Sequence, residues 1–194
     1  MVTAAILAGG RATRFGGRDK SALIVEGRSI LERQIAELLQ LTLDVLIVGR
    51  QSPDARARAV PDLVPGAGAL GGLHTALTEA RGDSTVVVAC DMPYVSAPML
   101  GYLAALTRDA DAVVPETERG YHPLCAAYTR ACLEPIARRL SDGRFKVIDF
   151  FADVRLRIVT GEELDRFGDP HRLLANVNTP AEYTGLETLQ GHQL

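Results

Sequence analysis

Residues 7–20 read Leu-Ala-Gly-Gly-Arg-Ala-Thr-Arg-Phe-Gly-Gly-Arg-Asp-Lys and come at the end of an apolar run that begins at Thr3. Such a run indicates a buried strand, and open α/β sheets bind ligands at the carboxyl ends of their strands. Four glycines allow the backbone of this stretch to approach a ligand closely, and four cations accompany one carboxylate. The stretch therefore predicts a polyphosphate-binding loop after the first strand of an α/β sheet.

Two alternatives to this interpretation depend on the glycine patterns. Residues 7–20 are not a Walker A loop, because an aspartate precedes Lys20, and on the residues alone a solvated arginine-rich turn is the alternative. Residues 66–71, Gly-Ala-Gly-Ala-Leu-Gly, match the dinucleotide fingerprint, with Asp91 about 20 residues beyond them. The segment before this fingerprint contains Pro61 and Pro65, so it is a poor central strand.

Short apolar runs rich in β-branched residues alternate with helical patterns, as in a parallel sheet covered on both faces. Strands are expected at Thr3–Ala8, Val45–Gly49, Thr85–Cys90, Ala112–Pro115, Leu124–Tyr128 and Val154–Val159, with a short extended segment at Ala22–Val25. Helices are expected after the capping box of Ser29 and Glu32, and at Gly68–Ala80, Ala97–Thr107, Arg130–Leu140, Lys146–Ala152 and Ala181–Leu189. We expect a single α/β domain over residues 1–190 and a frayed tail at 191–194.

The charge and the cysteine content argue against several classes of protein. A net charge of −3 and a pI near 5.8 argue against a nucleic-acid groove, which usually shows as a basic stripe. No apolar run is long enough to span a membrane, and no signal peptide is recognised, so a cytoplasmic protein is expected. Cys90, Cys125 and Cys132 form no C-x-x-C pair and are expected to be buried thiols.

The loop at residues 7–20 resembles the signature of the molybdenum cofactor guanylyltransferases, which belong to a larger nucleotidyltransferase family. The matching residues are Leu7, Gly9, Gly10, Arg14, Gly16 and Lys20. The resemblance continues in order at Val60-Pro61-Asp62, Gly71-Gly72-Leu73, Cys90-Asp91-Met92-Pro93-Tyr94, Gly120-Tyr121-His122-Pro123-Leu124 and Asn176-Val177-Asn178-Thr179-Pro180. It implies a Rossmann-like three-layer sandwich of the nucleotide-diphospho-sugar transferase type, with a mostly parallel central sheet.

The resemblance also implies a reaction, the transfer of GMP from GTP to the terminal phosphate of molybdenum-loaded molybdopterin, with release of pyrophosphate. An acceptor phosphate with a second pKa of about 6 is already an anion near neutral pH, so no general base is required. Arg14 and Lys20 are expected to neutralise charge on the β- and γ-phosphates. The implied nucleotide-binding residues are Leu7, Ala8, Gly9, Gly10, Lys20, Asp62 and Asp91.

Asp91 is the candidate ligand for a metal ion. It closes an apolar strand, so its carboxylate should emerge at the same sheet edge as the loop after the first strand. Mg²⁺ takes few protein carboxylates and completes its shell with water and phosphate oxygens, so one aspartate is a sufficient anchor. The loop and the resemblance favour Mg²⁺ as cofactor and Asp91 as its ligand over a simple turn or N-cap aspartate.

Two asparagines and a histidine are candidates for the acceptor site. Asn176 and Asn178 alternate around Val177 in an extended segment, so their side chains should point the same way. Neutral amides can complete a metal shell or hydrogen-bond a pterin edge, although an Asx turn before a helix is the alternative. His122 is a candidate wall of the acceptor site, and its alternative role is structural.

The identity of the nucleotide donor and the class of the protein each have an alternative. Gly49 stands at the position where some relatives of this family have an asparagine that contacts the nucleotide. Relatives that use CTP resemble L-A-A-G, with alanine at the position of Gly9, so a cytidylyltransferase, or another nucleotidyltransferase acting on a small phosphorylated acceptor, is the alternative enzyme. A non-catalytic nucleotide-binding protein is the alternative outside the enzymes. Expected partners are GTP, molybdopterin and the proteins that insert the cofactor or act as molybdoenzyme chaperones.

Overall fold

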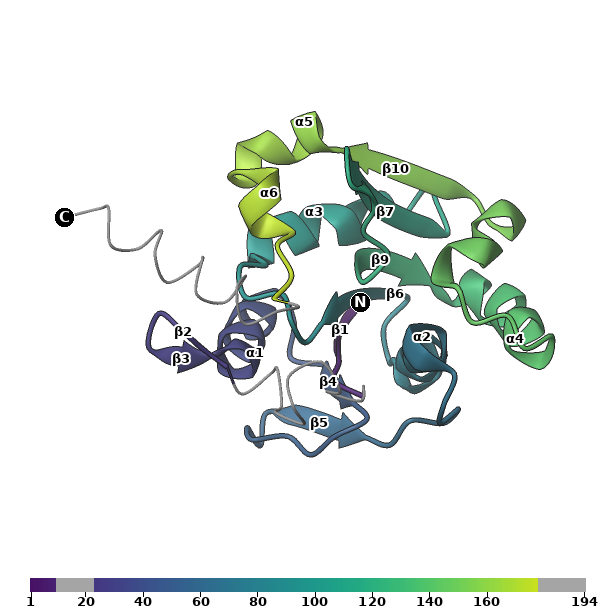
Figure 1. Cartoon of the computed structure of the whole chain (residues 1–194), viewed down its shortest axis with the longest axis horizontal. Coiled ribbons are helices and arrows are strands. Elements are labelled where there is room, and N and C mark those ends of the chain that lie inside the picture. The colour runs from purple at the N-terminus through teal and green to yellow at the C-terminus, as the bar shows by residue number, and fades with distance from the viewer. Residues whose placement is uncertain (10–22, 178–194) are drawn as a thin grey trace.

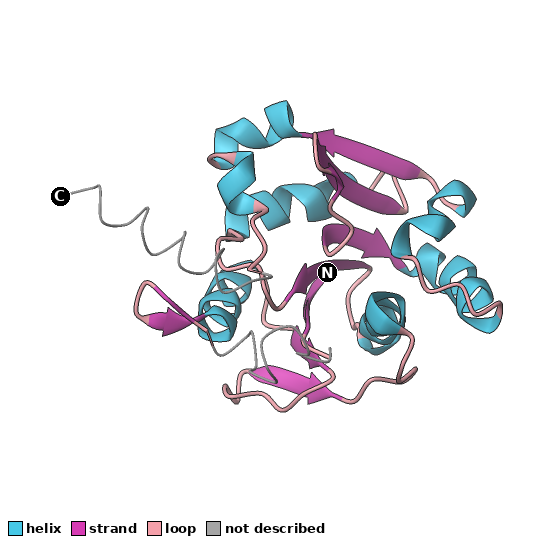
Figure 2. Ribbon diagram, in the orientation of Figure 1, coloured by secondary structure: helices cyan, strands magenta, loops and turns pink. Residues whose placement is uncertain are grey.

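The computed structural model describes residues 1–9 and 23–177, which form three layers around a central sheet (Figures 1 and 2). The order of strands across the sheet is β10-β7-β9-β6-β1-β4-β5, and β8 pairs with β7. The strands are β1 (Val2–Leu7), β4 (Val45–Val48), β5 (Ala57–Val60), β6 (Ser84–Ala89), β7 (Ala112–Thr117), β8 (Gly120–Tyr121), β9 (Cys125–Thr129) and β10 (Leu156–Thr160). Only β8 and β9 run against the others, so the predicted mostly parallel sheet is confirmed.

Helices cover both faces of this sheet. They are α1 (Ile30–Leu41), α2 (Gly68–Glu79), α3 (Ala97–Leu106), α4 (Leu133–Ser141), α5 (Gly161–Leu164) and α6 (Pro170–Leu173), with 3₁₀ turns η3 (Arg130–Cys132), η4 (Val147–Asp153) and η5 (Asp165–Phe167). Figure 1 shows α1 and α3 on one face and α2 and α4 on the other. Side chains of β1 alternate accordingly, because Ala4 and Ile6 pack in the α1 and α3 layer while Ala5 and Leu7 pack in the α2 and α4 layer.

The predicted capping box at the start of α1 is confirmed. Ser29 Oγ accepts the Glu32 N–H at 3.2 Å, and the Glu32 carboxylate accepts the Ser29 N–H at 2.9 Å. The preceding residues form a separate hairpin of β2 (Ile24–Val25) and β3 (Arg28–Ser29). This hairpin joins the loop after β1 to α1.

Several predicted elements were wrong in type or extent. The strand β5 was not expected, because it carries Arg58 between two alanines and lies at the sheet edge, where few apolar residues are needed. The helix expected at Lys146–Ala152 is the 3₁₀ turn η4, and α4 begins later than expected, after η3. Cys90 is only half-buried, whereas Cys125 and Cys132 are buried free thiols. The helix expected at Ala181–Leu189 and the tail at 191–194 lie outside the described residues.

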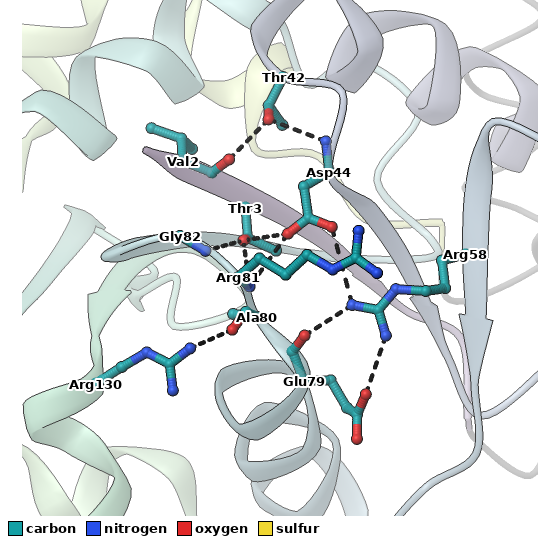
Figure 3. Close-up of polar contacts among 10 residues, drawn as sticks. All are labelled: Val2, Thr3, Thr42, Asp44, Arg58, Glu79, Ala80, Arg81, Gly82 and Arg130. Carbon is teal, nitrogen blue, oxygen red and sulfur yellow. Dashed lines mark hydrogen bonds and ion pairs between the residues drawn. The ribbon is translucent and has the colours of Figure 1, made fainter.

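A polar network joins the amino-terminal ends of the central strands (Figure 3). Thr3 Oγ1 donates to Asp44 Oδ2 at 2.6 Å and accepts the Gly82 N–H at 2.8 Å. Arg58 continues the network to Glu79 in α2, because its Nη1 donates to Glu79 Oε2 at 3.0 Å. Thr3 is fully buried, so its hydroxyl needs these partners. The network fixes the edge of the sheet opposite to the candidate site.

Candidate active site

The carboxyl ends of four neighbouring strands form one continuous edge. The strand β1 lies where the chain order reverses, with β4 and β5 on one side and β6 on the other, and ligands bind at such positions in open α/β sheets. Backbone hydrogen bonds extend the pairing just past the strand ends, from Ala8 N to Val48 O at 3.0 Å, from Gly49 N to Val60 O at 2.9 Å and from Cys90 N to Leu7 O at 3.2 Å. The residues that follow these strands therefore meet at the same edge.

Gly9 and Gly49 touch across this edge. Gly49 has φ +85°, and a Cβ on it would lie 2.6 Å from the Cα of Gly9. A Cβ on Gly9 would lie 3.4 Å from the Cα of Gly49 and 3.9 Å from Asp62 Oδ2. The departure noted at Gly49 thus has a structural reason, because a side chain there would push the start of the glycine-rich loop away from β4.

Asp62 follows β5 and is held by α2. Its Oδ1 accepts the Val64 N–H at 3.0 Å and lies 3.2 Å from Thr75 Oγ1. The same hydroxyl accepts the Leu63 N–H at 3.0 Å. These contacts use Oδ1, while Oδ2 is the Asp62 oxygen that would lie 3.9 Å from a Cβ on Gly9. Thr75, which is fully buried, is therefore a supporting residue of the site.

Asp91 follows β6 in a turn that Gln34 supports from α1. The Gln34 side-chain amide donates to the carbonyl oxygens of Ala89 at 2.7 Å and Met92 at 3.0 Å, which flank the half-buried Asp91. Gln34 is 1% exposed and lies among the buried apolar residues of α1. A polar side chain on such a stripe must find hydrogen bonds, and this is the signal by which sequence reasoning could have found it.

The carboxyl-terminal segment of the described chain reaches Asp91. The Val177 N–H donates to the Asp91 carbonyl oxygen at 2.8 Å, which places the exposed Asn176 beside the Asp91 turn. The side chain of Val177 is fully buried in a cluster with Val25 and Ile30. Two candidate residues that are distant in the sequence, Asp91 and Asn176, are thus brought together.

Some of the remaining candidate residues lie at the carboxyl edge of the sheet, and others are not described by the structure. Leu7 is buried under α2, where a Cβ on Gly72 would lie 3.4 Å from its Cδ1, so only its backbone can line a pocket above the sheet. Ala8 is half-buried and Gly9 is exposed at the edge. Gly10, Arg14, Lys20 and Asn178 lie outside the described residues.

His122 lies just before β9, next to the end of β6. The Ala89 N–H donates to the Leu124 carbonyl oxygen at 2.7 Å, which brings the start of β9 to the same sheet edge. His122 is half-buried, and its Nε2 lies 2.9 Å from Thr117 Oγ1. Burial lowers the pKa of His122, and Arg119 adds to this effect while Glu118 opposes it. The imidazole is therefore neutral near pH 7 and is already engaged by Thr117.

Residues 66–71 do not occupy the position of a dinucleotide fingerprint. They follow the edge strand β5 rather than the first strand of the sheet, and they open α2. A Cβ on Gly71 would lie 2.8 Å from the Val64 carbonyl oxygen, so this glycine permits close packing of α2 on the loop after β5. The pattern has a packing role here.

The described ranges 1–9 and 23–177 contain neither a cluster of metal-ligating side chains nor a membrane-spanning helix. Within these ranges, no group of three or more His, Cys, Asp or Glu side chains is placed to hold a metal ion. In the same part of the chain, no helix has the length and apolarity needed to cross a membrane.

A three-layer α/β fold with a glycine-rich loop after β1 and aspartates after β5 and β6 defines the nucleotidyltransferase class of the nucleotide-diphospho-sugar transferase type. Residues 4–155 match the MobA-like NTP transferase domain, and the chain belongs to this family. It is 36% identical to the probable molybdenum cofactor guanylyltransferase of Pelotomaculum thermopropionicum, over 93% of this chain and 89% of that protein. It is 34% identical to the molybdenum cofactor guanylyltransferase of Desulfosudis oleivorans, over 93% of this chain and 92% of that protein.

Solved structures agree with this assignment. Molybdopterin-guanine dinucleotide biosynthesis protein A from Archaeoglobus fulgidus superimposes with a TM-score of 0.83 at 25% identity, covering 98% of this chain and 99% of that one. The 2-C-methyl-D-erythritol 4-phosphate cytidylyltransferase from Thermus thermophilus superimposes with a TM-score of 0.71 at 16% identity, covering 98% of this chain and 100% of that one. The second likeness concerns the fold alone.

Proposed function

We propose that this protein transfers GMP from GTP to the terminal phosphate of molybdopterin and releases pyrophosphate. The observation that carries the proposal is the similarity to molybdenum cofactor guanylyltransferases along more than nine-tenths of the chain. The geometry supports it, because Gly9, Asp62 and Asp91 follow three strands that end at one edge.

In the proposed reaction, an oxygen of the acceptor phosphate attacks the α-phosphorus of GTP. A new phosphorus–oxygen bond forms, the bond between the α-phosphorus and the bridging oxygen breaks, and pyrophosphate leaves with that oxygen. Since the acceptor is already an anion, the protein needs to position two phosphate groups and neutralise their charge. Arg14 and Lys20 are proposed to neutralise the leaving pyrophosphate.

A magnesium ion fits the residues at the carboxyl edge. Asp91 carries a carboxylate directly after β6, and Asn176, which carries an amide, is next in the chain to Val177, whose N–H donates to the Asp91 carbonyl oxygen. Hard oxygen ligands of this kind, few in number, are what Mg²⁺ takes when substrate phosphates complete its shell. Bound there, Mg²⁺ would offset phosphate charge, and Asp91 is the residue proposed to hold it.

The acceptor is proposed to bind on the side of Asp91 away from Gly9. Asn176 lies beside the Asp91 turn, and His122 lies before β9, the next strand across the sheet. Asn178 is proposed to act with Asn176. Because Thr117 engages Nε2 of His122, we assign this histidine to the wall of the acceptor site rather than to proton transfer.

The test is to incubate the protein with molybdopterin, Mg²⁺ and each nucleoside triphosphate in turn, and to identify the product by mass. The guanine dinucleotide and pyrophosphate are expected with GTP. Formation of the cytosine dinucleotide instead would establish the cytidylyltransferase alternative. Binding of nucleotide without pyrophosphate release, with a preparation of molybdopterin that a known transferase converts, would establish a non-catalytic nucleotide-binding protein.

A further inference from the structure

Four side chains from separate segments meet beside the Asp91 turn, and we call them the clip: Glu26, Arg33, Tyr94 and Arg172. The Glu26 carboxylate bridges two of them, with Oε2 2.9 Å from Arg33 Nη1 and Oε1 3.1 Å from Arg172 Nη2. Glu26 lies in the turn between β2 and β3, Arg33 in α1 and Arg172 in α6. One carboxylate thus connects the hairpin, the first helix and the last described helix.

Tyr94 brings the Asp91 turn into the clip. The guanidinium carbon of Arg172 lies 4.5 Å from the centre of the Tyr94 ring, and that of Arg33 lies 5.6 Å from it. Arg33 Nε also donates to the Pro93 carbonyl oxygen at 3.2 Å. Gln34 binds the turn before Asp91, at the Ala89 carbonyl oxygen. The clip binds the turn after Asp91, because Tyr94 is three residues beyond it.

Arg172 and Val177 attach the same stretch of chain at two points. Arg172 contacts Glu26 and Tyr94, while the Val177 N–H donates to the Asp91 carbonyl oxygen at 2.8 Å. Asn176 lies between these two attachments. Leu173 and Leu174, which are buried in the core, also hold this stretch, so Arg172 and Val177 are two of the contacts that set the position of Asn176 relative to Asp91.

The two arginines of the clip differ in how exposed their side chains are, and therefore in how much each should contribute to folding stability. The Arg172 side chain is 58% exposed, and ion pairs this exposed contribute little to folding stability. Arg33 is the more enclosed partner, with its side chain 22% exposed, so it carries more of the structural role. A substitution at Arg172 can thus loosen the segment that follows it without unfolding the protein.

We propose that Arg172 is a positioning residue that holds Asn176 and Val177 against the Asp91 turn. The proposal rests on the proposed function in one respect, that Asp91 and Asn176 border the transfer site. Arg172 touches no reacting group and acts through Glu26 and Tyr94. Misplacement of a catalytic segment by about 1 Å can slow turnover about a hundredfold, so the effect of Arg172 should appear in kcat more than in stability.

The experiment compares Arg172→Ala with Arg138→Ala in the full chain. Arg138 is a matched control, because its side chain is 54% exposed and pairs with Glu134 at 3.1 Å on α4, on the other face of the sheet. The measurements are the melting temperature, the exchange rate of the Val177 amide proton, the Kd for GTP and the kcat for pyrophosphate release. Arg172→Ala should speed amide exchange at Val177 and lower kcat about ten- to a hundredfold, with GTP affinity and melting temperature near those of the control.

Two further variants test the route of the effect. Arg172→Lys keeps a charge near Glu26 but loses the planar group on Tyr94, so partial rescue of kcat and of Val177 protection is expected. If Arg172 acts through Glu26, the effects of Glu26→Gln and Arg172→Ala on kcat should be non-additive in the double variant.

Unchanged Val177 exchange in Arg172→Ala, or faster exchange with unchanged kcat, would overturn the proposal. If the unmutated protein transfers no nucleotide, the proposed function fails, and the exchange comparison still decides whether Arg172 holds the segment.

Discussion

A Cβ on Gly49 would lie 2.6 Å from the Cα of Gly9, so the ends of β4 and β1 meet through two glycines. This contact sets how closely the start of the glycine-rich loop lies over the sheet edge. Gly49 also has φ +85°, a conformation that side-chain-bearing residues rarely adopt. The pair therefore depends on glycine at position 49 for both backbone conformation and space.

Gly49→Ala should destabilise the protein and weaken nucleotide binding together. Overpacking of this kind typically costs about 1–3 kcal/mol, and the unfavourable φ adds to it. Denaturant unfolding and a Kd for GTP measure the two effects. Gly27→Ala is the control, because Gly27 also has a positive φ of +79° but nothing lies within 4 Å of its added Cβ. Equal effects of both variants would show that the contact with Gly9 is unimportant.

Gln34→Met should destabilise the turn that carries Asp91. Methionine nearly preserves the volume, but the Met92 carbonyl oxygen loses its Gln34 donor, while the Ala89 carbonyl oxygen keeps the Met92 N–H at 3.3 Å. A buried polar group left unsatisfied costs about 1–3 kcal/mol. The control is Gln40→Met, because Gln40 is exposed on the same helix. Loss of unfolding free energy in Gln34→Met but not in Gln40→Met is the expected result, and similar stabilities would contradict it.

The strand-end residues could be predicted from the sequence because each depends on a local pattern. Asp91 closes a run of β-branched residues, and Gly9 follows another, so their meeting at one edge follows from parallel strands. The strand β5 could not be recognised in the same way, since an edge strand needs few apolar residues and Pro61 follows it directly. Local pattern thus predicted that these candidate residues share one edge, but it did not predict the whole sheet around them.

The partners of the supporting residues could not be predicted, because they are distant in the sequence. Gln34 hydrogen-bonds residues more than fifty positions away, and Arg172 pairs with Glu26 across 146 positions. The helical pattern around Gln34 or Arg172 does not indicate which distant residue each one contacts. The proximity of Asn176 to Asp91 likewise follows from the pairing of Val177 with the Asp91 turn, which only the folded chain reveals.

Thr75→Val should loosen Asp62 while leaving α2 intact. Valine matches the shape of threonine, but the Leu63 N–H loses its acceptor and Asp62 Oδ1 loses a neighbouring hydroxyl. We expect a higher KM for GTP with a smaller change in kcat, because Asp62 is proposed to contact the nucleotide rather than the reacting phosphates. Thr78→Val on the exposed side of the same helix is the control. A change in kcat alone would argue against this role of Asp62.

Asp91→Asn should leave the protein folded and remove nearly all transfer. A neutral amide cannot hold Mg²⁺ against the repulsion of two phosphate groups, so the effect should fall mainly on kcat. The measurements are pyrophosphate release at saturating Mg²⁺ and the melting temperature, with Asp142→Asn at the exposed end of α4 as control. Retention of more than about a tenth of the rate would show that Asp91 is not the ligand, because loss of a key charge-stabilising group typically costs at least a hundredfold.

Gly9→Ala tests the choice of donor. The added methyl group would lie 3.4 Å from the Cα of Gly49 and 3.9 Å from Asp62 Oδ2, in the space between the ends of three strands. Guanine is larger than cytosine and is proposed to lie against this backbone, so the methyl group should disfavour GTP by about 1–3 kcal/mol, or roughly ten- to a hundredfold in specificity.

The measurement is the ratio of kcat/KM for GTP to that for CTP in both proteins. The ratio should fall in Gly9→Ala because the efficiency with GTP drops, while the low activity with CTP stays similar or rises slightly. Asp91 and the proposed cations are untouched, so the chemistry itself should survive the substitution. The contact with Gly49 is tight without being a clash, and the melting temperature should show that the fold tolerates the methyl group. An unchanged ratio, or a preference of the unmutated protein for CTP, would show that Gly9 does not select guanine.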